Sequence, residues 1–268
     1  MDFELKSLSP TQAAQSALDA LIVLVPDDPK AVDGKDPLNG LIREVSRRGD
    51  LESGLGKCLF IYRAAEVKVP RLVLVRAGDG GDTAVRKAMT AAIASVKVPS
   101  VKKLGVLLSL LPNESTAVRH AMTAVSETTY AYLTTKPSAK ARDIRQVVLG
   151  VREVSSARAG FRMGQAMVTG VELAREWANR PANHATPSHL ADAARKLGRK
   201  PRIKTEVLGH KEVSALGMGA FMAVAQGSAQ PLRFIVMQYQ GGPKGSAPAV
   251  LVGKGITFDT GGISLKPS

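Results

Sequence analysis

Two lysines and one aspartate lie on a glycine-rich segment close to the end of the sequence. Lys254, Asp259 and Lys266 stand in the stretch VGKGITFDTGGISLKP, which begins as the apolar run Ala249 to Val252 ends. Such a run predicts a strand buried on both faces, and the glycines allow the backbone after it to pass close to another group. A carboxylate suits divalent cations, and a lysine amine can join it as a ligand when burial and metal charge keep it neutral. The segment therefore favours metal-assisted chemistry.

Other readings of this segment fit less well. Glycine-rich turns after strands also bind phosphate groups, but no glycine stands five residues before Gly253, as a P-loop requires. No third glycine follows Gly253 and Gly255 at the spacing of G-x-G-x-x-G. The sequence also has no G-x-S-x-G, the motif of serine hydrolases. A metal-activated water is then the remaining nucleophile for hydrolysis.

The same stretch resembles, almost letter for letter, the metal-binding signature of the leucyl (cytosol) aminopeptidases, which are two-metal exopeptidases. Segments Ala174 to Ala191 and Gly217 to Gly241 match this family as well. The resemblance implies that Lys254 is a metal ligand, that Asp259 bridges both metals and that Lys266 polarises the scissile carbonyl. It also implies that Asp259 and Lys266 contact the substrate.

The family's chemistry gives further expectations. The resemblance implies peptide substrates, two divalent ions that are manganese or zinc, and a homohexamer. The metals would lower the pKa of a bridging water and bind the free amine of the substrate. Lys266 would stabilise the charge developing on the carbonyl oxygen as an ammonium group, whereas Lys254 would bind metal as a neutral amine.

The remaining metal ligands of the family lie further along its sequences. They are an aspartate soon after the Lys-Pro dipeptide and an Asn-Thr-Asp-Ala-Glu-Gly-Arg segment, and neither occurs before Ser268. Because one catalytic zinc normally takes about three protein ligands, we expect this chain to be the N-terminal portion of an aminopeptidase. We expect it to be inactive by itself.

The formal net charge of +14 raises a second hypothesis, a DNA-binding accessory or architectural protein built on the aminopeptidase scaffold. Residues 1–170 hold 24 basic and 17 acidic residues and residues 171–268 hold 13 and 6, so each part carries +7. No basic arm stands out, and we assign no nucleic-acid-binding residue. An aromatic content of 4% also argues against stacking on single strands. Weak, sequence-independent DNA binding is the most that we expect.

Cysteine and histidine do not suggest other chemistry. The single cysteine, Cys58, excludes a disulfide framework, and its apolar neighbours predict a buried structural thiol. No H-E-x-x-H occurs, so we expect surface or capping roles for His120, His184, His189 and His210. The start of the sequence lacks a basic and then apolar leader, and no apolar run reaches the roughly 18 residues of a membrane span. We therefore expect a cytoplasmic protein with no membrane association.

Apolar runs alternate with helix-length segments along the chain, which predicts an α/β fold. We expect two α/β domains joined by a long helix, with mostly parallel sheets covered by helices on both faces and an incomplete second domain. The boundaries are 1–155 for the N-terminal domain, 156–180 for the linker helix and 181–268 for the start of the metallopeptidase domain. Strands are predicted at 21–25, 57–62, 72–75, 104–110, 146–151, 203–208, 234–239 and 249–252. Helices are predicted from 36–37, at 83–96, 115–134 and 157–179, and from 186–187 and 210.

Overall fold

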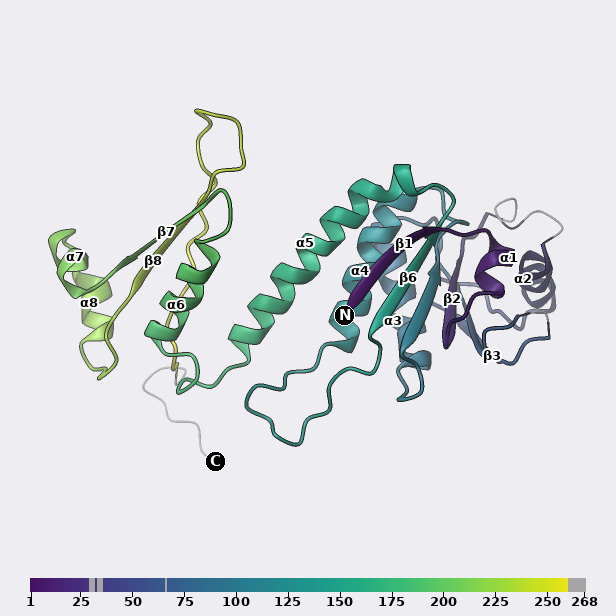
Figure 1. Cartoon of the computed structure of the whole chain (residues 1–268), viewed down its shortest axis with the longest axis horizontal. Helices are drawn as coiled ribbons and strands as arrows, with labels where there is room; N and C mark the ends of the chain where they lie inside the picture. Colours follow the sequence, from purple (N-terminus) through teal and green to yellow (C-terminus); the bar gives the residue numbers. More distant parts are fainter. Residues whose placement is uncertain (29–31, 33–35, 66, 260–268) are drawn as a thin grey trace. The chain divides into compact units, whose positions relative to one another are not determined.

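The structure is a computed structural model that describes residues 1–28, 32, 36–65 and 67–259 (Figure 1). It divides into two compact units, Met1–Ala174 and Arg175–Ser268. The strands are β1 (Asp2–Ser7), β2 (Ala20–Val25), β3 (Cys58–Tyr62), β4 (Arg71–Arg76), β5 (Lys103–Leu107), β6 (Gln146–Val151), β7 (Ile203–Leu208) and β8 (Phe234–Tyr239). The helices are α1 (Pro10–Ala14), α2 (Pro37–Arg48), α3 (Asp82–Val96), α4 (Glu114–Thr129), α5 (Val154–Ala178), α6 (Pro187–Leu197), α7 (His210–Ala215) and α8 (Gly219–Ala225).

The first unit contains a six-stranded sheet in the order β1-β6-β5-β2-β4-β3. Neighbouring strands are parallel except for β3, which runs antiparallel to β4 at one edge. This is the mostly parallel α/β arrangement that the alternation predicts. Strand β1, which the sequence patterns did not reveal, forms the opposite edge.

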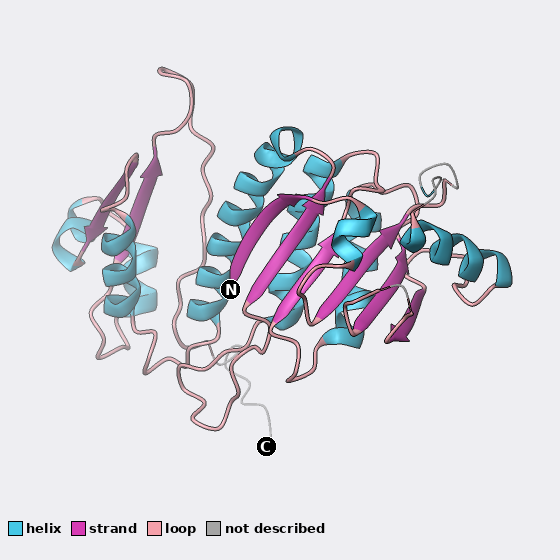
Figure 2. Cartoon of the chain, turned by 45° about the vertical axis from the view of Figure 1, so that its right-hand side comes forward, coloured by secondary structure: helices cyan, strands magenta, loops and turns pink. Residues whose placement is uncertain are grey.

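Alternate side chains of the central strands face two separate cores. Ile22 and Leu24 of β2 pack into a cluster with α3, α4 and α5, whereas Leu21 and Val23 pack into a second cluster with α1 and α2. Figure 2 shows the sheet lying between these helices. Because both faces are covered, β2 reads as a continuous apolar run instead of an alternating one.

Several helix ends follow signals that are visible in the sequence. Asp36 is the N-cap of α2, with Oδ1 accepting from the amide of Leu38 at 2.9 Å, and Pro37 takes the first helical position. The helix ends at Gly49, whose φ of 85° is accessible to glycine without strain. Thr186 caps α6 in the same way.

Three predicted segments differ from the structure in the first unit. Strand β5 stops at Leu107, because residues 108–111 form a turn, with the Leu111 amide donating to the Leu108 carbonyl at 2.9 Å. Helix α4 ends at Thr129 and not at 134. The helix predicted at 157–179 is α5, which spans Val154–Ala178, and the side chains of Met163 and Met167 along it are exposed.

The second unit holds α6, α7, α8 and the pair β7 and β8. The two strands are antiparallel, with Leu208 opposite Phe234, so this sheet is not parallel as the alternation predicted. Few apolar residues are buried in the described part of this unit: Ala185, Ala191, Ala194 and Val213. Among the described residues of the whole chain, no helix is both long and apolar enough to cross a lipid bilayer.

Candidate functional site

The side chains of Lys254 and Asp259 meet in an ion pair, in which Nζ donates to Oδ2. Both lie in a segment without regular secondary structure, and their side chains are 64% and 47% exposed. The structure thus brings together two of the three candidate residues. Lys266, the third, lies outside the described residues.

This pair supplies a nitrogen and a carboxylate oxygen, which are donors that manganese and zinc both accept. In this contact the lysine nitrogen donates a hydrogen to the carboxylate, whereas a metal ligand must offer a lone pair. A metal ion would therefore take the place of that proton. The donor types fit a divalent metal, although two donors alone do not complete a site.

The strand predicted just before the pair does not form. Residues 249–252 have no regular secondary structure, and Leu251 and Val252 are 97% and 94% exposed. A strand needs a neighbour to satisfy its amides and carbonyls, and in the described part of the chain β7 and β8 pair only with each other. Counting the described residues only, a Cβ added at Gly253 or Gly255 would meet no atom within 4 Å, so the close approach that the glycines predicted is not seen there.

The histidines do not gather into a metal site. Among the described residues, no group of three or more His, Cys, Asp or Glu side chains could hold a metal ion. His189 completes the capping box of α6 by accepting the Thr186 amide on Nδ1 at 3.3 Å, as a capping role predicts. His120 is not a surface or cap residue, because it is partly buried with Nε2 at 3.2 Å from Oδ2 of Asp82.

Cys58 does not occupy the buried position that its neighbours predicted. It lies on the exposed face of β3, where burial alternates between exposed and partly buried side chains. Leu59 and Ile61 pack on the core whereas Cys58, Phe60 and Tyr62 are exposed, so the apolar run is covered on one face only.

Two family models match most of the chain. Residues 22–153 match the N-terminal domain of the cytosol aminopeptidase family, and residues 172–268 match its catalytic domain. The chain belongs to the cytosol aminopeptidase family. The catalytic-domain match contains Lys254, Asp259 and Lys266.

Curated relatives in this family align along the entire chain. A probable cytosol aminopeptidase of Polaromonas naphthalenivorans is 52% identical over 270 residues, which cover 100% of this chain and 52% of the relative. One of Albidiferax ferrireducens is 50% identical, and the alignment covers 100% of this chain and 55% of that protein. The chain therefore spans about half the length of the curated relatives that it matches.

Solved structures share the fold. The bottromycin maturation enzyme BotP, in a complex with Mn, matches with a TM-score of 0.70 and 25% identity over 94% of this chain and 51% of that chain. A mutant of tomato leucine aminopeptidase matches with a TM-score of 0.69 and 22% identity over 88% of this chain and 50% of that chain. At this identity the tomato enzyme supports the fold alone.

Proposed function

We propose that the protein to which this chain belongs is a metal-dependent aminopeptidase that releases N-terminal residues, leucine among them, from peptides. The observation that carries the proposal is the contact between Lys254 and Asp259 inside the region that matches the family's catalytic domain. The family and its relatives are named as peptidases, which favours this function over the DNA-binding alternative.

Each of the three residues has a separate task in this proposal. Lys254 and Asp259 would hold the metal ions, with Asp259 shared between two of them. Lys266 would place a positive charge beside the substrate carbonyl, where negative charge develops. When bound, a pair of manganese or zinc ions supplies Lewis acidity and an activated water.

Substitution of Asp259 tests the metal assignment. In the full-length protein, Asp259→Ala should abolish hydrolysis of leucine amide and lower the amount of metal that co-purifies, as measured by elemental analysis. Glu206→Ala is the matched control, because Glu206 is an exposed acid on β7 of the same unit. Unchanged turnover and metal content in Asp259→Ala would refute the assignment.

Substitution of Lys266 tests whether the two lysines have different roles, with Lys254 as a metal ligand and Lys266 as the charge beside the substrate carbonyl. Lys266→Ala should keep its metal and lose rate by about 10² or more, which is the scale of one electrostatic donor. Loss of metal in this variant, with metal retained in Lys254→Ala, would reverse the two roles.

We extend the proposal to assembly and location. On the family resemblance, the full-length protein is a cytoplasmic homohexamer, and the names of the relatives include the word cytosol. Light scattering of the purified protein tests the assembly, and a mass other than six subunits would contradict it. Cell fractionation tests the location, and activity in the membrane fraction would contradict it.

A further inference from the structure

Strand β3 leaves one edge of the six-stranded sheet open. It is the last strand in the sheet order and pairs with β4 on one side, and no other described strand pairs with its outer side (Figure 1). Natural proteins usually protect such an edge with charged residues or proline. The sequence of β3, Cys-Leu-Phe-Ile-Tyr, contains neither.

One face of β3 is apolar and exposed. Leu59 and Ile61 pack against the core with α1 and α2, whereas Phe60 and Tyr62 on the other face are 43% and 55% exposed. In the described part of the chain, the outer backbone edge of β3 therefore has no strand neighbour and lies beside exposed aromatic side chains. These are the two features that strand addition of an extended peptide uses.

The end of this strand is positively charged. The guanidinium carbons of Arg63 and Arg71 lie 5.5 and 5.6 Å from the centre of the Tyr62 ring. Arg71 donates to the Ser100 hydroxyl at 3.0 Å, but among the described residues neither arginine forms an ion pair. Within the described part of the chain, these two guanidinium groups close to one ring thus have no carboxylate partner.

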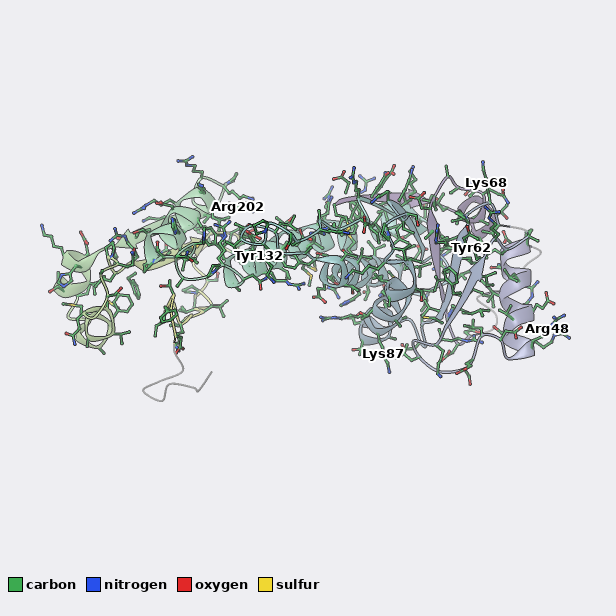
Figure 3. The ribbon with its side chains drawn as sticks, turned by 90° about the horizontal axis from the view of Figure 1, so that it is seen from below. Arg48, Tyr62, Lys68, Lys87, Tyr132 and Arg202 are labelled. Carbon is green, nitrogen blue, oxygen red and sulfur yellow. The ribbon has the colours of Figure 1, made fainter. Side chains whose placement is uncertain are left out.

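A third cation lies at the other end of the strand. The stem of Lys87 lies over Gly56, just before β3, and Figure 3 labels Lys87 and Tyr62 with their side chains. Glu52, an acid in the described loop before β3, already pairs with Lys57 at 2.5 Å. The rim of this edge is therefore basic.

We propose that the outer edge of β3 binds an acidic, extended segment of a partner protein, which adds to the sheet as a further strand. Its backbone would complete the hydrogen bonds of residues Cys58–Tyr62, and its carboxylates would pair with Arg63 and Arg71. We refer to these residues as the β3 edge. Guanidinium–carboxylate pairs are charge-assisted and directional, so they would also set the register of the added strand.

Charge complementarity favours an acidic partner over a second copy of this chain. Antiparallel pairing of two β3 strands centred on Phe60 would place Lys57 of each copy opposite Arg63 of the other. Like charges directly opposite each other destabilise a strand pair. The net charge of +14 adds to this repulsion.

The test uses a fluorescent, N-acetylated peptide of alternating glutamate and valine, since acetylation protects it from an aminopeptidase. Fluorescence anisotropy with the chain should show saturable binding that weakens as salt is added. Arg63→Glu with Arg71→Glu should weaken binding by about tenfold, the scale of two charged contacts at an interface. Alkylation of Cys58, the single cysteine, should slow when the peptide is present.

Matched controls separate this proposal from general attraction to a basic protein. The double variant Lys136→Glu, Lys140→Glu changes the net charge as much as Arg63→Glu with Arg71→Glu does. Its substitutions lie in the exposed loop between α4 and β6, so it should bind the peptide as the unmodified chain does. A peptide with N-methylated backbone amides should bind poorly, because strand addition needs those amides. Equal binding of the N-methylated peptide, equal loss in both charge variants, or dimerisation that depends on Arg63 and Arg71 would each overturn the proposal.

Discussion

Cys58 combines an exposed side chain with a raised thiol pKa. Partial burial of the sulfur raises its pKa, and the thiol donates to the Gly56 carbonyl at 3.4 Å. Because the thiolate is the nucleophile, iodoacetamide should alkylate Cys58 more slowly at neutral pH than it alkylates a cysteine in an unstructured peptide. The rate should rise with pH through a midpoint above that of the peptide, which intact-mass spectrometry can follow. An identical pH profile for the two thiols would contradict this prediction.

Glu172 links two segments of the first unit. Its Oε1 accepts from Arg142 at 2.7 Å and from the Ser126 hydroxyl at 2.6 Å. Burial raises the pKa of the carboxyl, but the hydrogen bonds from Arg142 and Ser126 and the charge of Arg142 outweigh it and leave the pKa below its ordinary value. The charged form is therefore the one that the folded state favours.

The sign of this shift predicts a pH dependence. A lowered pKa contributes stability that is present above the unfolded value of about 4.3 and is lost as the pH falls through the folded value. Glu172→Gln should therefore lower the free energy of unfolding near pH 7, and this difference from the unmodified chain should shrink below about pH 4.3. Urea unfolding of both proteins at several pH values measures this difference in the free energy of unfolding.

A surface ion pair provides the control for Glu172. Glu127 pairs with Arg86 at 2.7 Å, and both side chains are more exposed than those of Glu172 and Arg142. Exposed pairs contribute about 0–1 kcal/mol, so Glu127→Gln should change stability less than Glu172→Gln at neutral pH. A larger effect of Glu127→Gln would show that burial does not decide the contribution.

Among the elements, α5 depends on a close approach to α4. Gly160 is buried, its amide donates to the Ser115 hydroxyl at 3.0 Å, and an added Cβ would lie 1.8 Å from the Ser115 carbonyl oxygen. Since that oxygen belongs to the backbone, Gly160→Ala should force the helices apart and cost about 1–3 kcal/mol or more. Thermal unfolding followed by circular dichroism measures the loss.

Gly170→Ala in the same helix is the matched control. An added Cβ there would meet no atom within 4 Å, and alanine favours a helix over glycine by about 1 kcal/mol. This variant should be as stable as the unmodified chain or more so. Equal destabilisation by the two substitutions would mean that contact with α4 is not the cause.

The elements that could be predicted are those whose signals are local. Capping residues located α2 and α6, and continuous apolar runs located β2 and β4, because these features depend on a few adjacent residues. An apolar run cannot show how many faces are covered, so the exposed face of β3 and the unpaired residues 249–252 were both assigned to the interior. The types of Lys254 and Asp259 indicated their chemistry, whereas their contact required the structure.

At the scale of the whole molecule, apolar burial is uneven between the two units. Both core clusters belong to the first unit, while four small or medium apolar residues are buried in the described part of the second: Ala185, Ala191, Ala194 and Val213. The positive charge, in contrast, lies in both units: residues 1–174 hold 24 basic and 18 acidic residues, a net +6, and residues 175–268 hold 13 and 5, a net +8. Apolar burial is therefore concentrated in the first unit, whereas the net positive charge is not.

This uneven burial predicts how fragments will behave. A fragment of residues 1–174 holds both clusters and should unfold in one cooperative transition. A fragment ending near Gly150 contains a complete alternation of strands and helices. It lacks α5, however, and Ala157, Phe161 and Val168 of this helix belong to or pack against the core cluster with α3 and α4. It should melt at a lower temperature or associate through the uncovered apolar surface.

A fragment of residues 175–268 completes the comparison. Because the described part of this unit buries so little apolar area, this fragment should show no cooperative unfolding transition by itself. Calorimetry and sedimentation of the three fragments beside the whole chain measure these differences. The fragment ending near Gly150 is compared directly with the 1–174 fragment: if it were monomeric and had the same melting temperature, α5 would contribute no stability to the core of the first unit. The linker helix would then belong to neither unit, and the energetic boundary would lie before α5 and not within it.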